Sequence, residues 1–267
     1  MSTDDLLEMI LRAPVYDVAV ETPLDAAKLL SMRLDNQIWI KREDLQPVFS
    51  FKLRGAYNKI RSMSEVERKA GIVAASAGNH AQGVALAASR LGVAARVVMP
   101  RTTPGIKVDA VRRLGADTVL EGDGYDEAYA LARRIERDEG RTLVHPYDDL
   151  DVIAGQGTVA LEILRQHRGV IDAIFVPVGG GGLIAGICAY VKRISPSTRV
   201  IGVEPEDAAS LAAALQAGEC VDIGRVGLFA DGVAVRKVGD RPFEIVRGFV
   251  QEVVTVDTDE ICAAIRD

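Results

Sequence analysis

Strand-like and helix-like segments alternate along almost the whole chain, and this alternation restricts the fold more than any other feature of the sequence. Short apolar runs typical of buried strands, such as 71–76 and 173–178, each precede a longer segment with helical periodicity. Strands that alternate with helices in this way form parallel sheets. The sequence therefore predicts an α/β fold whose parallel sheets are covered by helices on both faces.

The individual elements follow from the same pattern and from capping residues. The predicted strands are 37–41, 71–76, 96–99, 118–120, 142–145, 173–178, 199–204 and 252–256. The predicted helices are 51–61 with Ser50 as N-cap, 80–91 ended by Gly92, 103–115, 126–139 ended by Gly140, 152–167, 183–194, 208–217 and a last segment that Thr258 caps. This short last helix stops at Asp267 with nothing after it to pack on it, so we expect the chain to be a fragment of a longer protein.

Composition excludes several classes of function. The net charge of −6 is spread along the chain without a basic stripe, so we expect no nucleic-acid partner. We also expect no membrane span and no signal peptide, because apolar runs are short and 1–11 is acidic. Cys188, Cys220 and Cys262 are far apart and odd in number, which favours free thiols in a reducing compartment and a cytoplasmic location.

Lys52 is the first candidate for chemistry. It lies between Phe51 and Leu53 in the first turn of a predicted helix. The positive end of a helix and apolar neighbours both disfavour an ammonium group, so they lower the pKa of the amine and favour a Schiff base. On position alone, an ordinary surface lysine is the commoner alternative.

The second candidate is the turn from Ser76 through Ala77, Gly78 and Asn79 to His80. A strand that enters a helix through small residues directs several backbone N–H groups at one point, which suits a carboxylate or a phosphate. The alternative is an ordinary turn with Asn79 as a cap and His80 as a packing residue.

The third candidate is the glycine loop Gly179–Gly182, which follows a strand and precedes a helix at Leu183. Its backbone can wrap closely round an anion. Gly180, Gly182 and Ala185 also fit the dinucleotide pattern G-x-G-x-x-G/A, and Glu204 ends the next strand. The loop alone leaves a phosphate ester and a dinucleotide equally open.

A metal site and a serine-hydrolase triad are not predicted. The histidines His80, His145 and His167 have spacings that suggest no metal ligands.

Together these segments resemble a known family. The stretch 41–56 resembles the pyridoxal-phosphate (PLP) lysine segment of threonine dehydratases, 76–83 their substrate-carboxylate loop, and 179–183 their phosphate loop. The stretches 202–207 and 229–235 are similar to the biosynthetic branch of that family. The order of the motifs favours PLP over a dinucleotide.

The resemblance implies the type II PLP-enzyme fold, which is tryptophan synthase β-like and has two α/β domains with the cofactor between them. The large domain would contain 1–53 and 150–267, and the small domain 54–149. The family's catalytic domain continues beyond this point, with a serine for the pyridine nitrogen and, in the biosynthetic branch, a regulatory domain.

The resemblance also implies roles for individual residues. Lys52 would carry PLP as a Schiff base and act as general base. The other cofactor-binding residues would be Phe51 at the ring face, Asn79 at the 3-hydroxyl, the amides of Gly179, Gly180, Gly181, Gly182 and Leu183 at the phosphate, and Gly232. The substrate carboxylate would bind to Ser76, Ala77, Gly78 and His80.

The implied reaction is dehydration and deamination of L-threonine to 2-oxobutanoate and ammonia, the first step of isoleucine biosynthesis. The implied partners are a small amino-acid substrate and further copies of the chain in a dimer or tetramer. A serine dehydratase or serine racemase-like enzyme and a non-catalytic fragment are the alternatives. Ala77 stands where serine racemases have a second serine, and Ser210 stands where they have a metal-binding aspartate, so the resemblance favours elimination without a metal.

Overall fold

The computed structural model describes residues 3–250 and 252–266. The chain divides into two compact units: unit 1 contains Met1–Leu11, Glu21–Glu43 and Gly157–Asp267, and unit 2 contains Arg12–Val20 and Asp44–Gln156. This division describes compactness alone, so the domain boundaries implied by the family resemblance stay a prediction.

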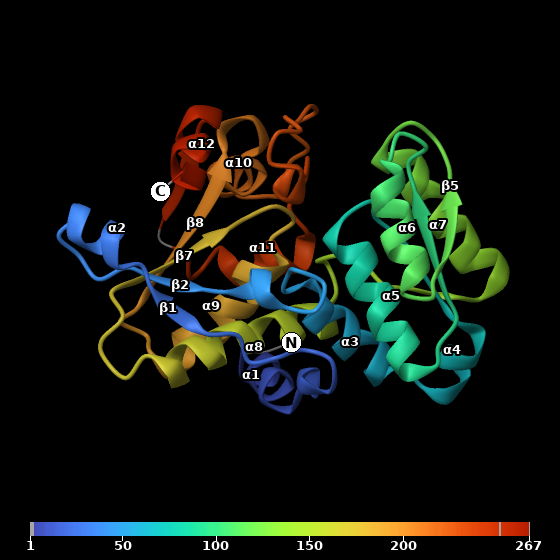
Figure 1. Cartoon of the computed structure of the whole chain (residues 1–267), viewed down its shortest axis with the longest axis horizontal. Helices are drawn as coiled ribbons and strands as arrows, with labels where there is room; N and C mark the ends of the chain where they lie inside the picture. Colours follow the sequence, from blue (N-terminus) through green and yellow to red (C-terminus); the bar gives the residue numbers. More distant parts are fainter. Residues whose placement is uncertain (1–2, 251, 267) are drawn as a thin grey trace. The chain divides into compact units, whose positions relative to one another are not determined.

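Unit 2 contains a four-stranded sheet in the order β5-β4-β3-β6 (Figure 1). Every neighbouring pair in it is parallel, as predicted. The strands are β3 (Ile72–Ala75), β4 (Ala95–Met99), β5 (Asp117–Leu120) and β6 (Thr142–Leu143). The helices are α3 (Lys52–Ser62), α4 (Glu65–Ala70), α5 (Asn79–Leu91), α6 (Gly105–Arg113), α7 (Tyr125–Glu139) and the first half of α8 (Leu150–Gln166).

Helices cover both faces of this sheet because successive strand residues point in opposite directions. One face packs against α7, and its apolar cluster contains Val73, Ala75, Val98, Ala128, Ala132 and Ile135. The other face belongs to a larger cluster that contains Ile72, Ala74, Val97 and Met99 together with apolar residues of α3, α5 and α6. All four residues of β3 are buried, which explains its unbroken apolar sequence.

Unit 1 contains a second parallel sheet in the order β7-β8-β9 and a separate antiparallel pair, β1 with β2. The strands are β1 (Leu24–Ala26), β2 (Trp39–Lys41), β7 (Ala173–Pro177), β8 (Arg199–Pro205) and β9 (Glu252–Val256). The helices are α1 (Thr3–Arg12), α2 (Lys28–Arg33), α9 (Gly182–Ile194), α10 (Ser210–Ala217), α11 (Asp240–Val246), α12 (Thr258–Arg266) and the second half of α8. In β7, Ile174 and Val176 are buried, whereas Phe175 is 63% exposed.

The structure confirms each predicted strand and helix to within a few residues at the ends. It adds α1, β1, α2, α4 and α11, and four 3-10 turns at Val15–Asp17, Glu43–Leu45, Glu206–Ala208 and Asp231–Val233. Among these, α4 has a sequence signal that the prediction overlooked: Ser64 and Glu67 form a capping box.

Two predicted caps are wrong. The N-cap of α3 is Phe51, and the buried hydroxyl of Ser50 has no hydrogen-bond partner. Thr258 is the first residue of α12, and Asp257 caps that helix by accepting a 2.8 Å hydrogen bond from the N–H of Glu260. The predicted C-caps are confirmed, since Gly92 and Gly140 both adopt the left-handed conformation.

Candidate active site

Lys52 is the first residue of α3 and is half-buried. Its Nζ donates a hydrogen bond to the carbonyl oxygen of Pro146 at 3.2 Å and lies 5.3 Å from the centre of the Phe51 ring. Burial lowers the pKa of the amine from 10.5 to about 8. A much larger fraction of Lys52 is therefore neutral near pH 7 than of an ordinary lysine.

The helix that carries Lys52 is held by glycine contacts with two neighbouring helices. A Cβ at Gly83 of α5 would lie 2.9 Å from the backbone nitrogen of Leu53 and 3.0 Å from the carbonyl carbon of Lys52. A Cβ at Gly155 of α8 would lie 2.6 Å from the Cα of Gly55 in α3. These close approaches leave no room for side chains, so they fix the first turn of α3 on two sides.

The turn that follows β3 leads directly into α5. Gly78 is the N-cap of α5, and the Ser76 hydroxyl accepts a 3.2 Å hydrogen bond from the Gly78 N–H. Ser76, Ala77 and Gly78 are half-buried, and Asn79 is exposed. The first N–H groups of a helix have no partner within the helix, so this turn offers donors to an anion.

His80 is buried, with 3% of its surface exposed. Its Nε2–H donates to the Val144 carbonyl oxygen at 2.9 Å, and its Nδ1 has no hydrogen-bond partner. Burial, together with the nearby charge of Lys52, lowers the pKa of His80 to about 3. The ring is therefore neutral and offers a ligand only an acceptor at Nδ1, and its predicted part in carboxylate binding stays a prediction.

One segment after β6 receives hydrogen bonds from both Lys52 and His80, at Pro146 and at Val144. The carboxyl ends of the parallel strands β3 and β6 lie at the same edge of the sheet, where ligands of α/β proteins commonly bind. Unit 2 therefore brings Lys52 and the Ser76–His80 turn together. The sequence could not indicate the acceptors, because a backbone carbonyl is common to all residues.

The glycine loop in unit 1 has a conformation that requires glycine. Gly181 is the N-cap of α9 and has a φ of 88°, and a Cβ there would lie 2.9 Å from Pro242 Cβ and from Val238 Cγ2. A Cβ at Gly179 would lie 3.0 Å from the Cα of Val233. The loop therefore forms a tight backbone turn at the start of a 13-residue helix, as a phosphate cradle needs.

Gly232 precedes the residue that packs against Gly179, so unit 1 brings the Asp231–Val233 turn beside the loop. Gly232 is exposed, and Leu183 in the first turn of α9 is half-buried. Gly180 and Gly182 are buried, and the Gly180 carbonyl accepts a 3.1 Å hydrogen bond from Gly239.

The alternative of a dinucleotide site fails at Glu204. Its side chain is fully buried, and its two oxygens accept hydrogen bonds from the N–H groups of Leu211 at 2.8 Å and Ala212 at 2.9 Å. This carboxylate caps α10, so it is not presented to a ribose. Burial raises the pKa of Glu204 against the effect of these two donors.

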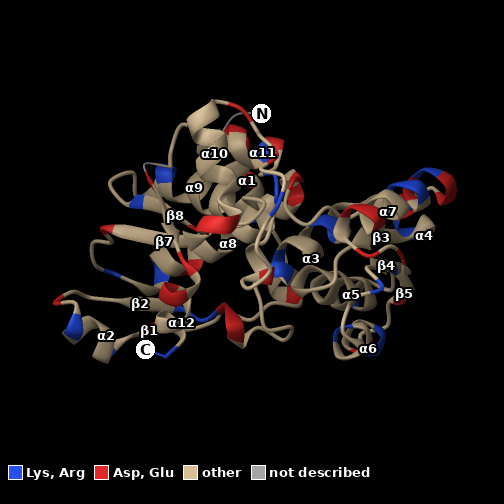
Figure 2. Ribbon diagram, turned by 90° about the horizontal axis from the view of Figure 1, so that it is seen from above, with Lys and Arg blue, Asp and Glu red and all other residues tan. Residues whose placement is uncertain are grey.

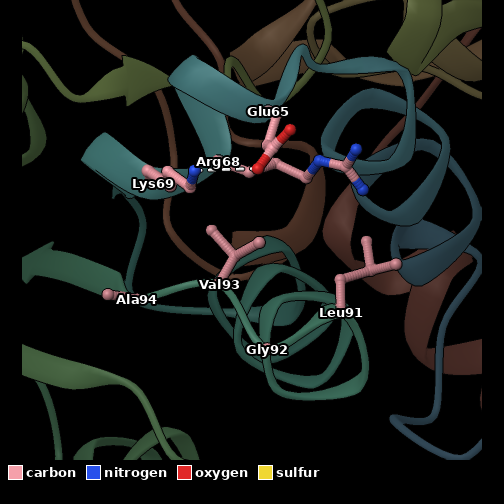
Figure 3. A pocket seen from close by; sticks show the side chains of 7 residues that line it. All are labelled: Glu65, Arg68, Lys69, Leu91, Gly92, Val93 and Ala94. Carbon is pink, nitrogen blue, oxygen red and sulfur yellow. Dashed lines mark ion pairs between the residues drawn. The ribbon is translucent and has the colours of Figure 1, made fainter.

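A hollow of about 430 Å³ elsewhere in unit 2 contains none of the predicted site residues (Figure 3). It is lined by Glu65, Arg68, Lys69, Leu91, Gly92, Val93 and Ala94. Glu65 and Lys69 form an exposed ion pair across one side of it. The hollow is open to solvent, and none of the residues predicted to bind cofactor or substrate lines it.

Lysine, arginine, aspartate and glutamate are scattered over the elements of both units (Figure 2). Within 3–250 and 252–266, no three His, Cys, Asp or Glu residues lie together as a metal site would require. In the same ranges, no helix has the length and apolar character needed to cross a membrane.

A family model described as "Pyridoxal-phosphate dependent enzyme" matches residues 15–267. The chain belongs to this family. Its arrangement of parallel sheets and helices is that of the type II fold, which confirms the fold class expected from the resemblance.

Named relatives of this PLP-dependent enzyme agree with the resemblance to threonine dehydratases. The biosynthetic L-threonine dehydratase of Burkholderia multivorans is 55% identical over 270 residues, which cover 100% of this chain and 53% of that protein. The solved processed form of threonine deaminase isoform 2 from Solanum lycopersicum is 51% identical with a TM-score of 0.97, over 99% of this chain and 77% of that one. Maize serine racemase is 33% identical with a TM-score of 0.94, over 97% and 79%. The chain thus spans about half the length of the curated relatives it matches.

The residues present fit PLP. In unit 2, burial lowers the pKa of the Lys52 amine, and the buried atoms Ser50 Oγ and His80 Nδ1 have no hydrogen-bond partner. In unit 1, the loop around Gly181 leaves no space for a Cβ and ends at a helix N-terminus. The aldehyde of PLP needs a neutral amine, and its phosphate ester needs a tight backbone turn at a helix N-terminus.

Proposed function

We propose that this chain is the catalytic part of a PLP-dependent threonine dehydratase, which converts L-threonine to 2-oxobutanoate and ammonia for isoleucine biosynthesis. The observation that carries the proposal is the amine of Lys52, whose pKa burial lowers to about 8, in a chain 55% identical to a biosynthetic threonine dehydratase. PLP, when bound, supplies an electron sink for the charge that develops at the substrate Cα.

Lys52 has two tasks in this proposal. Its neutral amine would hold the cofactor, and the same amine, once free, would remove the Cα proton of the substrate as general base. Both tasks require an unprotonated Nζ, so the burial that lowers the pKa serves the chemistry. The Pro146 carbonyl holds Nζ in position at 3.2 Å.

The remaining assignments concern binding. In unit 2, the turn at Ser76, Ala77, Gly78 and His80 would receive the substrate carboxylate. Asn79 would hydrogen-bond the 3-hydroxyl of the cofactor, and Phe51 would lie against its ring. In unit 1, the amides of Gly179, Gly180, Gly181, Gly182 and Leu183 would hold the phosphate, with Gly232 beside them. His80 would support the turn as a neutral ring.

Serine is the competing substrate. A relative named serine racemase has the same fold, so the geometry alone allows either amino acid. Ala77 favours elimination over racemisation, because it has no hydroxyl that could return a proton to the opposite face.

The test is to incubate the purified chain with PLP and then with L-threonine or L-serine, measuring 2-oxobutanoate, pyruvate and D-serine. We expect a visible cofactor band that changes with threonine, and 2-oxobutanoate as the faster product. Lys52→Ala should lose the band and the activity. A band with no product from either amino acid would support the alternative of a non-catalytic fragment.

Cofactor affinity tests the phosphate assignment separately. Gly181→Ala should weaken PLP binding, because its Cβ would collide with Pro242 and Val238. Gly218→Ala is a matched control, since Gly218 has a φ of 78° but nothing within 4 Å of a Cβ. Equal PLP affinity in both variants would refute the assignment.

A homo-oligomer and a cytoplasmic location complete the proposal. Sedimentation of the purified chain distinguishes a dimer or tetramer from a monomer. Fractionation of the source cells tests the location.

A further inference from the structure

Residues 15–20, here called the strap, lie against the segment that contains Lys52, and both belong to unit 2. The strap begins with the 3-10 turn Val15–Asp17, whose Asp17 carboxylate accepts a 2.6 Å hydrogen bond from the Tyr57 hydroxyl of α3. Val18 and Ala19 are buried in the same apolar cluster as Leu53. The strap is therefore anchored in the core beside α3.

The last residue of the strap, Val20, is joined to the turn that precedes Lys52. Gln46, which is 1% exposed, accepts a 3.0 Å hydrogen bond from the Val20 N–H and donates a 2.9 Å bond to the Val20 carbonyl. A buried side-chain amide that satisfies both groups of one residue holds it in a single orientation.

The same Val20 carbonyl also accepts a 3.3 Å hydrogen bond from the guanidinium of Arg54, which is fully buried. Gln46 lies six positions before Lys52 and Arg54 lies two positions after it. One peptide group thus connects to the chain on both sides of the candidate cofactor lysine.

The segment between Gln46 and Arg54 also contains backbone strain. Phe49 has a φ of 58°, which is unusual for a large side chain, and its side chain is 75% exposed. Its N–H donates to the Gln46 carbonyl at 2.8 Å, which closes the turn. Such strain persists only where the surroundings enforce it.

We propose that Gln46 and Arg54, through their shared bonds to Val20, are positioning residues that set the direction of Lys52. The bonds of these two side chains to Val20 fix the angle between the turn 46–51 and the first turn of α3. They thereby hold Nζ of Lys52 in its half-buried place against Pro146. The inference rests on the proposed role of Lys52 as the cofactor lysine.

The experiment measures the amine of Lys52 in the chain without added PLP. Limited acetylation over pH 6–11, read by mass spectrometry of peptides, yields an apparent pKa for each lysine. Lys69, an exposed lysine of α4 that pairs with Glu65 and contacts neither Gln46 nor Asn58, is the internal reference. The variant is Gln46→Met, which keeps the size of the side chain and removes both bonds.

The matched control is Asn58→Ala, which removes one bond from α3, the 2.7 Å bond to the Asp151 carbonyl, away from the strap. We expect Gln46→Met to raise the apparent pKa of Lys52 by about one unit towards that of a free lysine, a tenfold change in its protonation equilibrium. Asn58→Ala should lower the denaturant midpoint but leave the Lys52 titration unchanged.

An unchanged Lys52 titration in a folded Gln46→Met variant would overturn the proposal. If that variant does not fold, Gln46→Asn replaces it, since this uncharged amide is one methylene too short to keep both bonds to Val20. The same shift in Asn58→Ala would also overturn the proposal, because it would show a general loosening of α3. Failure of the proposed function would look different: wild-type Lys52 would bind no PLP, whatever the titrations show.

Discussion

Replacing Lys52 by methionine should stabilise the cofactor-free protein at neutral pH. The fall in the pKa of Lys52 from 10.5 to about 8 corresponds to about 3 kcal/mol of unfavourable free energy for the charged, folded form. The Phe51 ring, 5.3 Å from Nζ, favours the ammonium and offsets part of this. We therefore expect Lys52→Met to raise the free energy of unfolding by about 1–2 kcal/mol at pH 7.

The contribution of Lys52 to the free energy of unfolding depends on pH in a definite direction. Between pH 8 and 10.5 the unfolded chain binds more protons at Lys52 than the folded chain does, so the stability of the wild type rises with pH across this window. The difference between wild type and Lys52→Met should be largest below pH 8 and should vanish above pH 10.5.

The assay is urea unfolding of both proteins at pH 7 and pH 10.5, followed by circular dichroism. Lys59→Met is the control, and we expect it to lower the free energy of unfolding at pH 7. The carboxylates of Asp149 and Asp151, at 2.8 and 3.3 Å, stabilise the charge of Lys59. A Lys52→Met variant less stable than the wild type at pH 7 would refute the reasoning, since it would show that the ammonium is well solvated or well paired in the fold.

Three further predictions concern the surroundings of Lys52. Gly83→Ala should lower the free energy of unfolding by about 1–3 kcal/mol, because its Cβ would lie 2.9 Å from the Leu53 nitrogen; Gly105→Ala, with open space around its Cβ, should be neutral or stabilising in the same denaturation assay. Phe49→Gly should be more stable than Phe49→Ala by about 1 kcal/mol, the reverse of the usual order, because only glycine adopts the φ of 58° without strain; the usual order would show that the turn relaxes. His80 has its pKa lowered to about 3 by burial, so it should contribute stability that is lost as the pH falls from 6.5 to 3; NMR titration of its ring should show no change between pH 5 and 8, and a transition near pH 6.5 would contradict the assignment.

Local patterns predicted much of the fold correctly, because they depend on neighbouring residues. The buried strand β3 follows from its apolar run, and the ends of α5 and α7 follow from Gly92 and Gly140, which adopt the left-handed conformation. The prediction of Ser50 as the N-cap of α3 is wrong, because the position of this cap depends on the fold around it and not on the local sequence alone. The strained turn at Phe49 moves the start of the helix to Lys52 and leaves the Ser50 hydroxyl buried.

By itself, the sequence determined the alternation of elements, and it predicted Lys52, the turn 76–80 and the glycine loop 179–182 as candidate site segments, because backbone freedom and side-chain type are properties of short segments. Only the tertiary structure decided how those groups are used. It assigns Glu204 to the cap of α10 and commits the N–H of His80 to Val144. It also joins Val20 to both sides of Lys52, through contacts across 26 and 34 residues. Such contacts depend on which backbone groups meet in space, and every residue except proline has the same backbone groups, so no pattern of residue types can indicate them.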